Sequence, residues 1–165
     1  MSPEFSSKRK PGVITYAEQT DILERINGYL HTVYPYKRNS ACVCDNYKEH
    51  AESFRIITHR KKFDIYLRFG KYWVDENQKT ITIARIGFHQ QRSGHGTRLL
   101  RLLSEIAAQH GYKYIAIEQV NDNSERFALR YGFKKSTLYT SCYFIAVAEL
   151  VGSLKLACSQ MASVD

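Results

Sequence analysis

The feature that most constrains this chain is a short stretch with two glycines, residues 91–96, which separates two segments of different hydrophobic periodicity. Before it, residues 80–88 alternate between apolar and small or polar side chains, as in a half-buried β-strand. After it, apolar residues recur at helical spacing until Gly111, a residue type that commonly ends helices. The sequence therefore predicts a strand that passes through a tight turn into a helix.

Such a connection favours the binding of an anion. The unpaired N–H groups of the first helical turn and the positive end of the helix dipole are directed at one spot. Gly94 and Gly96 lack side chains, so a bulky anion such as a pyrophosphate can approach the main chain closely. The alternative is that the two glycines only close a tight strand-to-helix connection.

The spacing of the glycines narrows the kind of phosphate site. A dinucleotide fingerprint requires three glycines, and a nucleoside-triphosphate loop requires Gly-Lys-Ser/Thr, and the turn has neither pattern. It does match Gln/Arg-x-x-Gly-x-Gly/Ala through Gln91, Gly94 and Gly96. This pattern, between a strand and a helix, resembles the acyl-CoA pyrophosphate loop of the GNAT superfamily of N-acetyltransferases.

Length and charge set the class of protein. The chain has 165 residues, enough for one domain with its own core. No run approaches the roughly 20 apolar residues that span a bilayer, and the N-terminus has no apolar signal-peptide core, so we expect a soluble, cytoplasmic protein with no membrane partner. The net charge of +8 includes basic clusters at residues 8–10 and 59–62. It favours polyanionic ligands such as coenzyme A or nucleic acid, although a solvated surface is the alternative.

The cysteines do not indicate a metal or a disulfide framework. Cys42 and Cys44 form a Cys-x-Cys pair near His50, but a fourth ligand and the usual zinc spacing are missing, and Cys142 and Cys158 stand alone. We therefore expect reduced cysteines and no bound metal.

The pattern along the chain predicts one domain over residues 11–151. Residues 1–5 read as the product of a cloning site, and together with the basic residues that follow they form a predicted disordered head over 1–10, while 152–165 are a C-terminal tail. Helices and strands are expected in this order: a helix at 16–33, an irregular stretch at 34–52 with a short helix near 45–51, strands at 54–58, 63–69, 80–88 and 112–120, a helix at 121–131, and a strand-rich segment at 133–150 broken near 140–141.

A second motif strengthens the resemblance. GNAT enzymes commonly have an asparagine after their fifth strand, then small and apolar residues at set intervals, and Gly-Phe at the end of a helix. Asn121, Ser124, Phe127 and Gly132-Phe133 match this register. The resemblance implies an α/β fold of the α+β type, the GNAT acyl-CoA N-acyltransferase fold: a central, mostly antiparallel mixed sheet that splays at a cofactor notch and is flanked by helices.

The same motif departs from the family at one position. The frequent family tyrosine, a general acid toward the departing thiolate, falls on Ala128. Tyr131 lies three residues later on the same predicted helix, so it is our candidate to replace it. Tyr139 and Tyr143 are further candidates. A core or rim position is the alternative for each, because the chain has 12 tyrosines.

The resemblance also implies acetyl-CoA as the cofactor, with its amide-bearing arm paired to the strand edge like an additional strand. The main chain of Ile86 and Phe88 would bind this arm, and a strand amide near Ile86 would bind the thioester oxygen. Arg92 and His95 would add charge or hydrogen bonds to the phosphates, with a solvent-facing side chain as the alternative for each. Ser93 or Thr97 would cap the helix. The full set implied in cofactor binding is Ile86, Phe88, Gln91, Arg92, Ser93, Gly94, His95, Gly96, Thr97 and Asn121.

The implied reaction is direct attack of a primary amine on the thioester, which requires a base to remove a proton from the ammonium form. The strand before the turn has no acid, so Glu118, at the end of the next strand, is the preferred base. An ion pair with a nearby Lys or Arg is the alternative role for Glu118. His89 and bulk water are the other candidates.

The acceptor remains open at this stage. A small amine, an antibiotic, a protein amine and charged tRNA all fit, and Tyr34, Tyr36, Tyr47 and Tyr139 are predicted to line the acceptor slot. The absence of a tyrosine at Ala128 also fits a GNAT-fold binding or regulatory module that has lost catalysis. A third hypothesis is nucleic-acid binding as the primary role, although no RNA-binding motif supports it.

Overall fold

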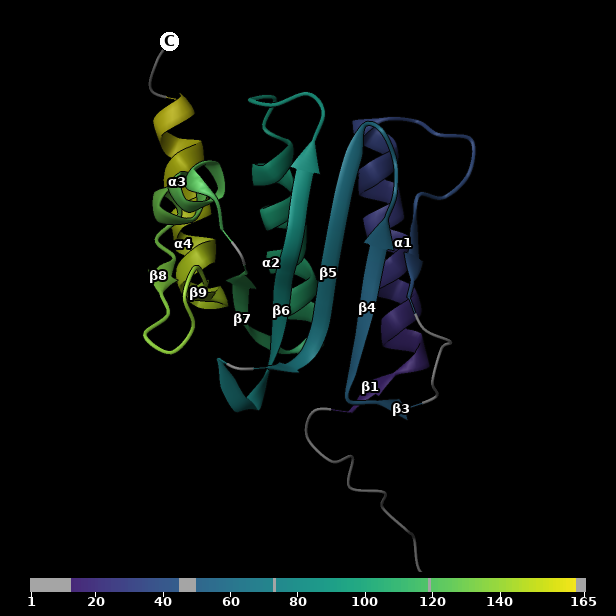
Figure 1. Ribbon diagram of the computed structural model, residues 1–165, viewed down its shortest axis with the longest axis horizontal. Coiled ribbons are helices and arrows are strands. Elements are labelled where there is room, and N and C mark those ends of the chain that lie inside the picture. The colour runs from purple at the N-terminus through teal and green to yellow at the C-terminus, as the bar shows by residue number, and fades with distance from the viewer. Residues whose placement is uncertain (1–12, 45–49, 73, 119, 163–165) are drawn as a thin grey trace, which may run out of the picture.

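The computed structural model describes residues 13–44, 50–72, 74–118 and 120–162, and these contain a seven-stranded sheet (Figure 1). Its strand order is β2-β4-β5-β6-β7-β9-β8, and β1 and β3 form a separate ladder. The strands are β1 (Ile14–Thr15), β2 (Ala41–Val43), β3 (His50–Ala51), β4 (Ser53–Thr58), β5 (Phe63–Tyr72), β6 (Asp75–Phe88), β7 (Tyr112–Ile117), β8 (Lys134–Lys135) and β9 (Tyr143–Ala146). In the large sheet, β6 and β7 are parallel and the other neighbours are antiparallel, which confirms the predicted mixed sheet.

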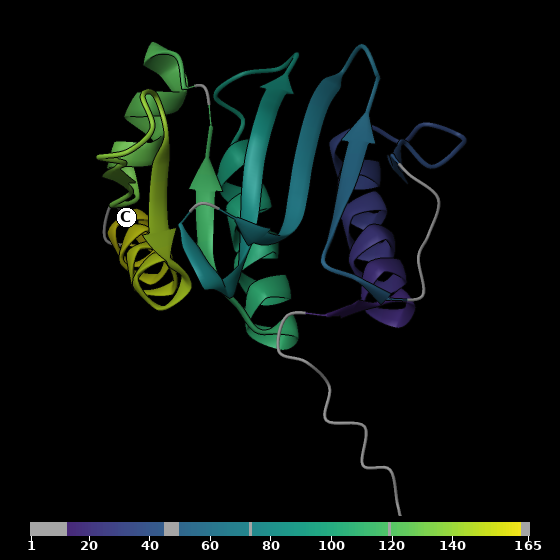
Figure 2. The same ribbon diagram turned by 60° about the horizontal axis from the view of Figure 1, so that its bottom comes forward.

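Four helices flank this sheet in the described residues: α1 (Tyr16–Val33), α2 (His95–His110), α3 (Asp122–Arg130) and α4 (Val147–Ala162). Figures 1 and 2 show α1 and α2 against one face of the sheet, and α3 and α4 at the end where β8 and β9 lie. None of these helices has the length and apolarity to cross a membrane.

Local sequence explains where the helices begin and end. Thr15 caps α1, because its hydroxyl accepts a hydrogen bond from the Glu18 N–H at 3.2 Å. Asn121 and Ser124 form a reciprocal capping box at the start of α3. Gly111 ends α2 with a φ of 77°, a left-handed conformation that glycine adopts without steric cost.

The core lies between the sheet and α1 and α2. Alternate residues of the central strands point to this side, and so do the apolar stripes of the two helices. The central core side chains are at most 1% exposed: Ile22, Ile26, Phe63, Ile65, Leu67, Phe69, Ile81, Ile83, Leu99, Leu103 and Ile106. Tyr66 and Arg68 alternate with these core residues on β5, so they point to the opposite face of the sheet. The face of the sheet opposite the helices therefore carries polar side chains.

The C-terminal segment corrects part of the prediction. The hairpin near residues 140–141 is confirmed, since β8 and β9 pair antiparallel and Ser141 has a φ of 60°. The strand-rich segment is wrong from Val147 onward, where α4 begins and runs across the expected boundary at 151–152. Leu150 and Leu154 are buried on one face of this helix.

The remaining predictions concern the N-terminal half. The short helix expected near 45–51 is wrong at its end, because His50–Ala51 form β3 instead, and residues 45–49 lie outside the described residues. The predicted disordered head at 1–10 also lies outside them.

Candidate functional site

The site begins where two parallel strands separate. Strands β6 and β7 pair up to Ile83 and Ile117, and the Glu118 N–H then donates to the Ile83 carbonyl at 3.0 Å. Farther along, the Val120 N–H donates to the Ser141 carbonyl, so the chain after β7 turns toward β9. Strand β7 ends at Ile117, three residues before the predicted end at Val120.

A β-bulge on β6 lies at the same point. Leu67 of β5 pairs with Ile83, whereas the preceding residue, Tyr66, pairs with Arg85, so Ala84 is the extra residue. A bulge bends its strand and increases the local twist. The bend therefore coincides with the separation of β6 from β7, and the two strands open into a notch.

The main chain of β6 faces this notch beyond the bulge. Ile86 pairs with Ile65, whose N–H is turned away toward the Thr58 hydroxyl on β4 at 2.8 Å. Two facing residues of an antiparallel pair direct their N–H and C=O groups either at each other or away from each other. Because the N–H of Ile65 points away, toward β4, the N–H and C=O of Ile86 point away from β5 and toward the notch. Phe88 follows two residues later with the same orientation. These are the two positions expected to bind the pantetheine arm.

The turn after β6 leads directly into α2. Gly94 precedes the helix with a φ of 76°, and Arg92 also has a positive φ, 59°. Within the described residues no side chain caps α2. The predicted caps are wrong, because the Ser93 hydroxyl donates to the Gln91 carbonyl and the Thr97 hydroxyl bonds to Tyr131. The first N–H groups of α2 are thus left without a side-chain acceptor, which suits an external anion.

The two glycines of the turn serve different purposes. A Cβ at Gly94 would meet no atom within 4 Å, so its positive φ is the reason for glycine there. A Cβ at Gly96 would lie 3.2 Å from two ring carbons of Phe127 on α3. Glycine at 96 therefore lets α3 pack closely on the start of α2.

His95 is held on three sides. Its ring lies 5.2 Å from that of Phe88, and its carbonyl accepts a hydrogen bond from the Tyr29 hydroxyl at 2.6 Å. Its Nδ1 accepts from the Arg98 guanidinium at 2.5 Å. Burial, and then the positive charge of Arg98, lower the pKa of His95 below its ordinary value of 6.5. The ring is therefore neutral at neutral pH.

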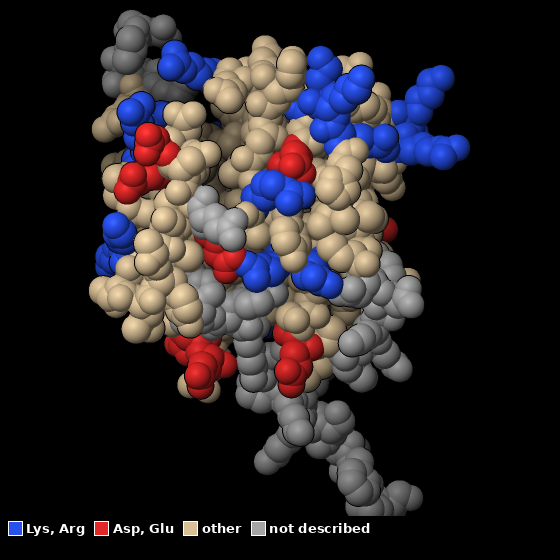
Figure 3. All heavy atoms as spheres, in the orientation of Figure 1, with Lys and Arg blue, Asp and Glu red and all other residues tan. Residues whose placement is uncertain are grey.

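A pocket of about 1080 Å³ joins the notch to the turn, and it contains all ten positions expected to bind the cofactor. In Figure 3 the surface is hollowed between the α3 side and the upper end of β6. The charged lining residues are Arg68, Arg85, Arg92, Glu118, Arg126 and Arg130. Five cations against one acid make this pocket suitable for a polyanion.

Glu118 lines the same pocket, with its carboxylate in an ion pair with Arg68. The ion pair with a cation, which the sequence offered as the alternative role of Glu118, is therefore present. Its partner, Arg68, also lines the pocket. Sequence reasoning missed Arg68. The available signal was strand alternation, which places Arg68 and its cross-strand neighbour Thr82 on the face of the sheet opposite the helices.

Tyr131 lies behind the pocket wall. It is 2% exposed and does not line the pocket, and its hydroxyl shares a 2.6 Å hydrogen bond with Thr97, which does. Helix α3 ends at Arg130, so Tyr131 is its C-cap, with φ and ψ of −96° and 6°, and its side chain is buried like that of Ala128. Tyr131 therefore reaches the pocket only through lining residues that it contacts, which include Thr97 by this hydrogen bond and Phe127 by ring packing at 5.2 Å.

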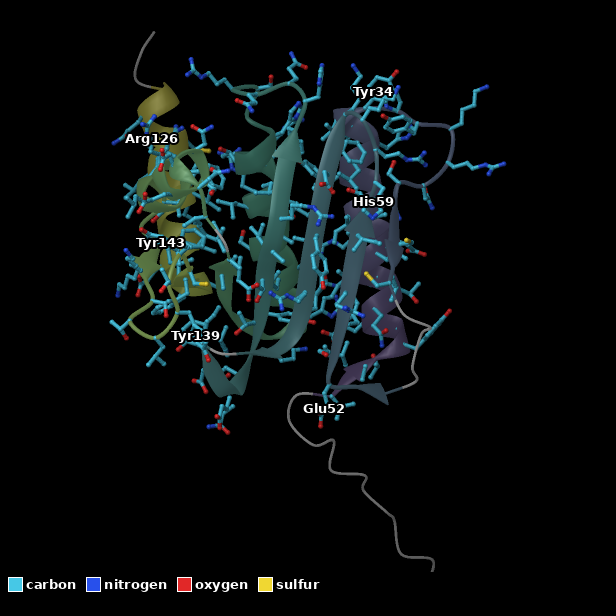
Figure 4. The ribbon with its side chains drawn as sticks, viewed as in Figure 1. Tyr34, Glu52, His59, Arg126, Tyr139 and Tyr143 are labelled. Atoms are coloured by element: carbon cyan, nitrogen blue, oxygen red, sulfur yellow. The ribbon has the colours of Figure 1, made fainter. Side chains whose placement is uncertain are left out.

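The other candidate acids and bases do not line the pocket either. Tyr143 is a buried residue whose hydroxyl donates to Glu125, and this hydrogen bond raises the pKa of Tyr143. Tyr139 is exposed in the loop before β9 (Figure 4). His89 is exposed, and its N–H donates to the Lys62 carbonyl at 3.0 Å.

The predicted acceptor slot is wrong. Figure 4 shows Tyr34 and Tyr139 on opposite sides of the molecule, and neither they nor Tyr36 line the pocket. Tyr47 lies outside the described residues. In the part of the chain that is described, no three His, Cys, Asp or Glu side chains gather as a metal site, and all four cysteines are free.

A model of the Acetyltransferase (GNAT) family matches residues 21–133. A comparison with curated proteins finds no match.

Several solved structures are similar. Apo FdhC, described as a nucleotide-linked sugar GNAT, is 15% identical, with 88% of this chain and 92% of that chain covered at a TM-score of 0.48. The KacTA–DNA complex is 14% identical, with coverage of 80% and 85% and a TM-score of 0.46. AtaTR bound with AcCoA is 14% identical, with coverage of 60% and 69% and a TM-score of 0.42.

Proposed function

The chain belongs to the GNAT acetyltransferase family, an acyl-CoA-dependent family of N-acetyltransferases, and we propose that it moves an acetyl group from acetyl-CoA directly to a primary amine. The family membership carries the reaction class. We infer the roles of individual residues from the pocket.

The residues around the pocket fit acetyl-CoA. The N–H and C=O groups of Ile86 and Phe88 face the notch and can pair with the amides of the pantetheine arm. The uncapped start of α2, with the turn from Gln91 to Gly96, can bind the pyrophosphate, and Thr97 and Asn121 complete the wall. Acetyl-CoA, when bound, supplies the acetyl group as an activated thioester.

Glu118 is the proposed base. It is at the point where β6 and β7 separate, and its carboxylate is fixed by Arg68 on the face of the sheet opposite the helices. A carboxylate there can take the proton of the incoming ammonium directly or through one water. Arg68 keeps that carboxylate oriented toward the pocket, so we assign it a positioning role.

Tyr131 has a positioning role in this proposal. Its hydroxyl fixes the Thr97 side chain in the first turn of α2, next to the groups proposed to bind pyrophosphate. Tyr131 does not line the pocket and Ala128 carries no hydroxyl, so neither is assigned as the acid toward the departing thiolate.

The observation that carries the proposal is the continuity of the pocket. One cavity contains the outward-facing edge of β6, the uncapped start of α2 and the Glu118–Arg68 pair. In a module without catalysis the Glu118–Arg68 pair would be a structural ion pair, whereas an acetyltransferase also requires a base beside the thioester.

Release of the coenzyme A thiol tests the proposal. We predict that a panel of primary amines contains an acceptor, and that Glu118→Gln lowers its turnover by about a hundredfold or more, the range of general-base catalysis, with little change in acetyl-CoA affinity. Asp64→Asn is the matched control. Asp64 is paired with Arg85 at 2.7 Å, but it does not line the pocket, so turnover should persist.

Two results would contradict this assignment. Acetyl-CoA binding without transfer to any amine would favour the binding module. Turnover that Glu118→Gln leaves unchanged would remove Glu118 from the mechanism.

A further inference from the structure

A second surface, separate from the pocket, combines cations with aromatic rings. It is formed by residues 34–38, after α1, and residues 60–62, in the turn between β4 and β5, and we call it the basic-aromatic surface. Neither segment contains Asp or Glu. Its members are Tyr34, Tyr36, Lys37, Arg38, Arg60, Lys61 and Lys62. In Figure 3 Lys and Arg atoms gather at the upper right, over these two segments.

Contacts between the segments hold the surface together. The Tyr34 and Tyr36 ring centroids are 4.6 Å apart, and Tyr36 packs edge-on against the buried Phe63 at 5.9 Å. The Arg60 guanidinium lies 4.8 Å from the Tyr36 ring centroid, and the Lys62 ammonium lies 5.5 Å from that of Tyr34. The rings are therefore anchored to the core and flanked by charge.

Part of this surface is available to a partner. Tyr34 is 41% exposed, and Lys37, Arg38 and Lys61 are exposed as well. Figure 4 shows Tyr34 and His59 on the same side of the molecule, away from Arg126 on the pocket wall. None of the seven members lines the pocket. The surface is thus no part of the proposed acetyl-CoA site.

We propose that the basic-aromatic surface binds single-stranded nucleic acid, with the cations on the phosphates and a base stacked on Tyr34. Charge alone would bind any polyanion, but an exposed ring supported from behind offers a face on which an unpaired base can stack. A duplex hides its base faces, so the surface favours single strands. This inference does not depend on the proposed acetyl transfer.

The test is fluorescence anisotropy of labelled single strands of RNA and DNA, with a duplex, inorganic polyphosphate and anionic vesicles as comparisons. The variant Lys37→Glu/Arg38→Glu/Lys61→Glu should weaken single-strand binding by about tenfold or more. It should also make the dependence of log K on log salt shallower by about 2, since each phosphate contact contributes about 0.7. The control Lys113→Glu/Lys135→Glu/Lys155→Glu changes the net charge equally at other exposed sites and should have little effect.

A second variant tests stacking. Tyr34→Ala should weaken single-strand binding by about tenfold, and Tyr34→Phe, which keeps the ring, should preserve it. Equal weakening by the two triple variants would overturn the proposal, as would duplex, polyphosphate or vesicle binding as strong as that of single strands. Full retention of binding by Tyr34→Ala would also overturn it. Unchanged thermal unfolding verifies that each variant is folded.

Discussion

At the scale of single residues, His95 illustrates how the turn presents its charge. An arginine guanidinium can only donate hydrogen bonds, so the contact between Arg98 and the His95 Nδ1 requires a ring nitrogen without a proton. The lowered pKa of His95 agrees with this. The positive character of the turn therefore comes from main-chain N–H groups and arginines, with no contribution from a charged histidine.

The pH dependence of stability follows from the same residue. As the pH falls through about 6.5, His95 gains a proton in the unfolded chain while the folded ring remains neutral, so the unfolded state binds more protons and stability decreases. We predict that His95→Gln reduces the loss of melting temperature between about pH 7 and pH 5. The exposed His31, changed to Gln, is the control. An equal loss of melting temperature in the wild type and in His95→Gln would show that His95 is not the cause of the pH dependence.

At the scale of elements, the start of α2 is positioned by its neighbours. The Tyr29 hydroxyl of α1 donates to the His95 carbonyl, and Tyr131, at the end of α3, bonds to Thr97. Burial raises the pKa of Tyr29 far above its ordinary value of 10.0, so its hydroxyl stays a donor across the physiological range. The geometry of the proposed anion site therefore depends on helices outside the turn.

Loss of one of these contacts gives a measurable effect. We predict that Tyr29→Phe, which removes the hydroxyl donor to the His95 carbonyl, lowers the free energy of unfolding by about 1 kcal/mol. It should also weaken acetyl-CoA binding, because the turn loses a restraint. Denaturant unfolding and calorimetry measure the two effects. An unchanged unfolding free energy together with unchanged affinity would contradict the role given to Tyr29.

Helix α4 contributes to the core beyond the expected end of the domain. Leu154 is 5% exposed and Leu156 is 66% exposed on the same helix. Replacing either by Ala changes helix propensity equally, so a difference in stability between the two variants reports the burial of Leu154. We predict that Leu154→Ala costs about 2–5 kcal/mol of unfolding free energy, in the range of core leucines. Leu156→Ala should change it by less than about 0.5 kcal/mol, as surface substitutions usually do. Similar costs for both would contradict the packing of α4.

Elements whose signal is local could be predicted from the sequence. The change from strand to helix period around Gly94 and Gly96 predicted the position of the turn. The helix predicted at 121–131 begins within one residue of α3, which Asn121 caps. The bulge at Ala84 could not be predicted, because it exists only in the register between two strands. Helix α4 was missed because its apolar residues follow the apolar strand β9 without a Gly or Pro to separate them.

Side-chain roles within the site were less predictable than its location. The pocket lining contains every expected cofactor-binding position and Glu118. Most of these lie on β6 or in the turn that follows it, and Glu118 and Asn121 follow the neighbouring strand β7. Tyr131 lies behind the pocket wall because its side of α3, like that of Ala128, packs into the core, and the sequence pattern does not show which side of the helix faces a cavity. Arg68 was missed because its pairing with Glu118 joins strands far apart in the sequence.

At the scale of the whole molecule, the parallel pairing of β6 with β7 joins two antiparallel groups of strands. The first contains β2, β4, β5 and β6, and the second contains β7, β9 and β8. The notch opens where this junction ends, and α2 begins beside it. The central claim is therefore that acetyl-CoA binds across the junction with its pyrophosphate at the start of α2.

Calorimetric titration of acetyl-CoA into the wild type, Gly94→Trp and Gly111→Trp tests this claim most directly. Both glycines have a positive φ, 76° and 77°, and a Cβ on either would meet no atom within 4 Å, so the variants carry a similar backbone strain at opposite ends of α2. We predict that Gly94→Trp abolishes binding and that Gly111→Trp retains it. No binding to folded wild type, or equal binding by both variants, would contradict the account.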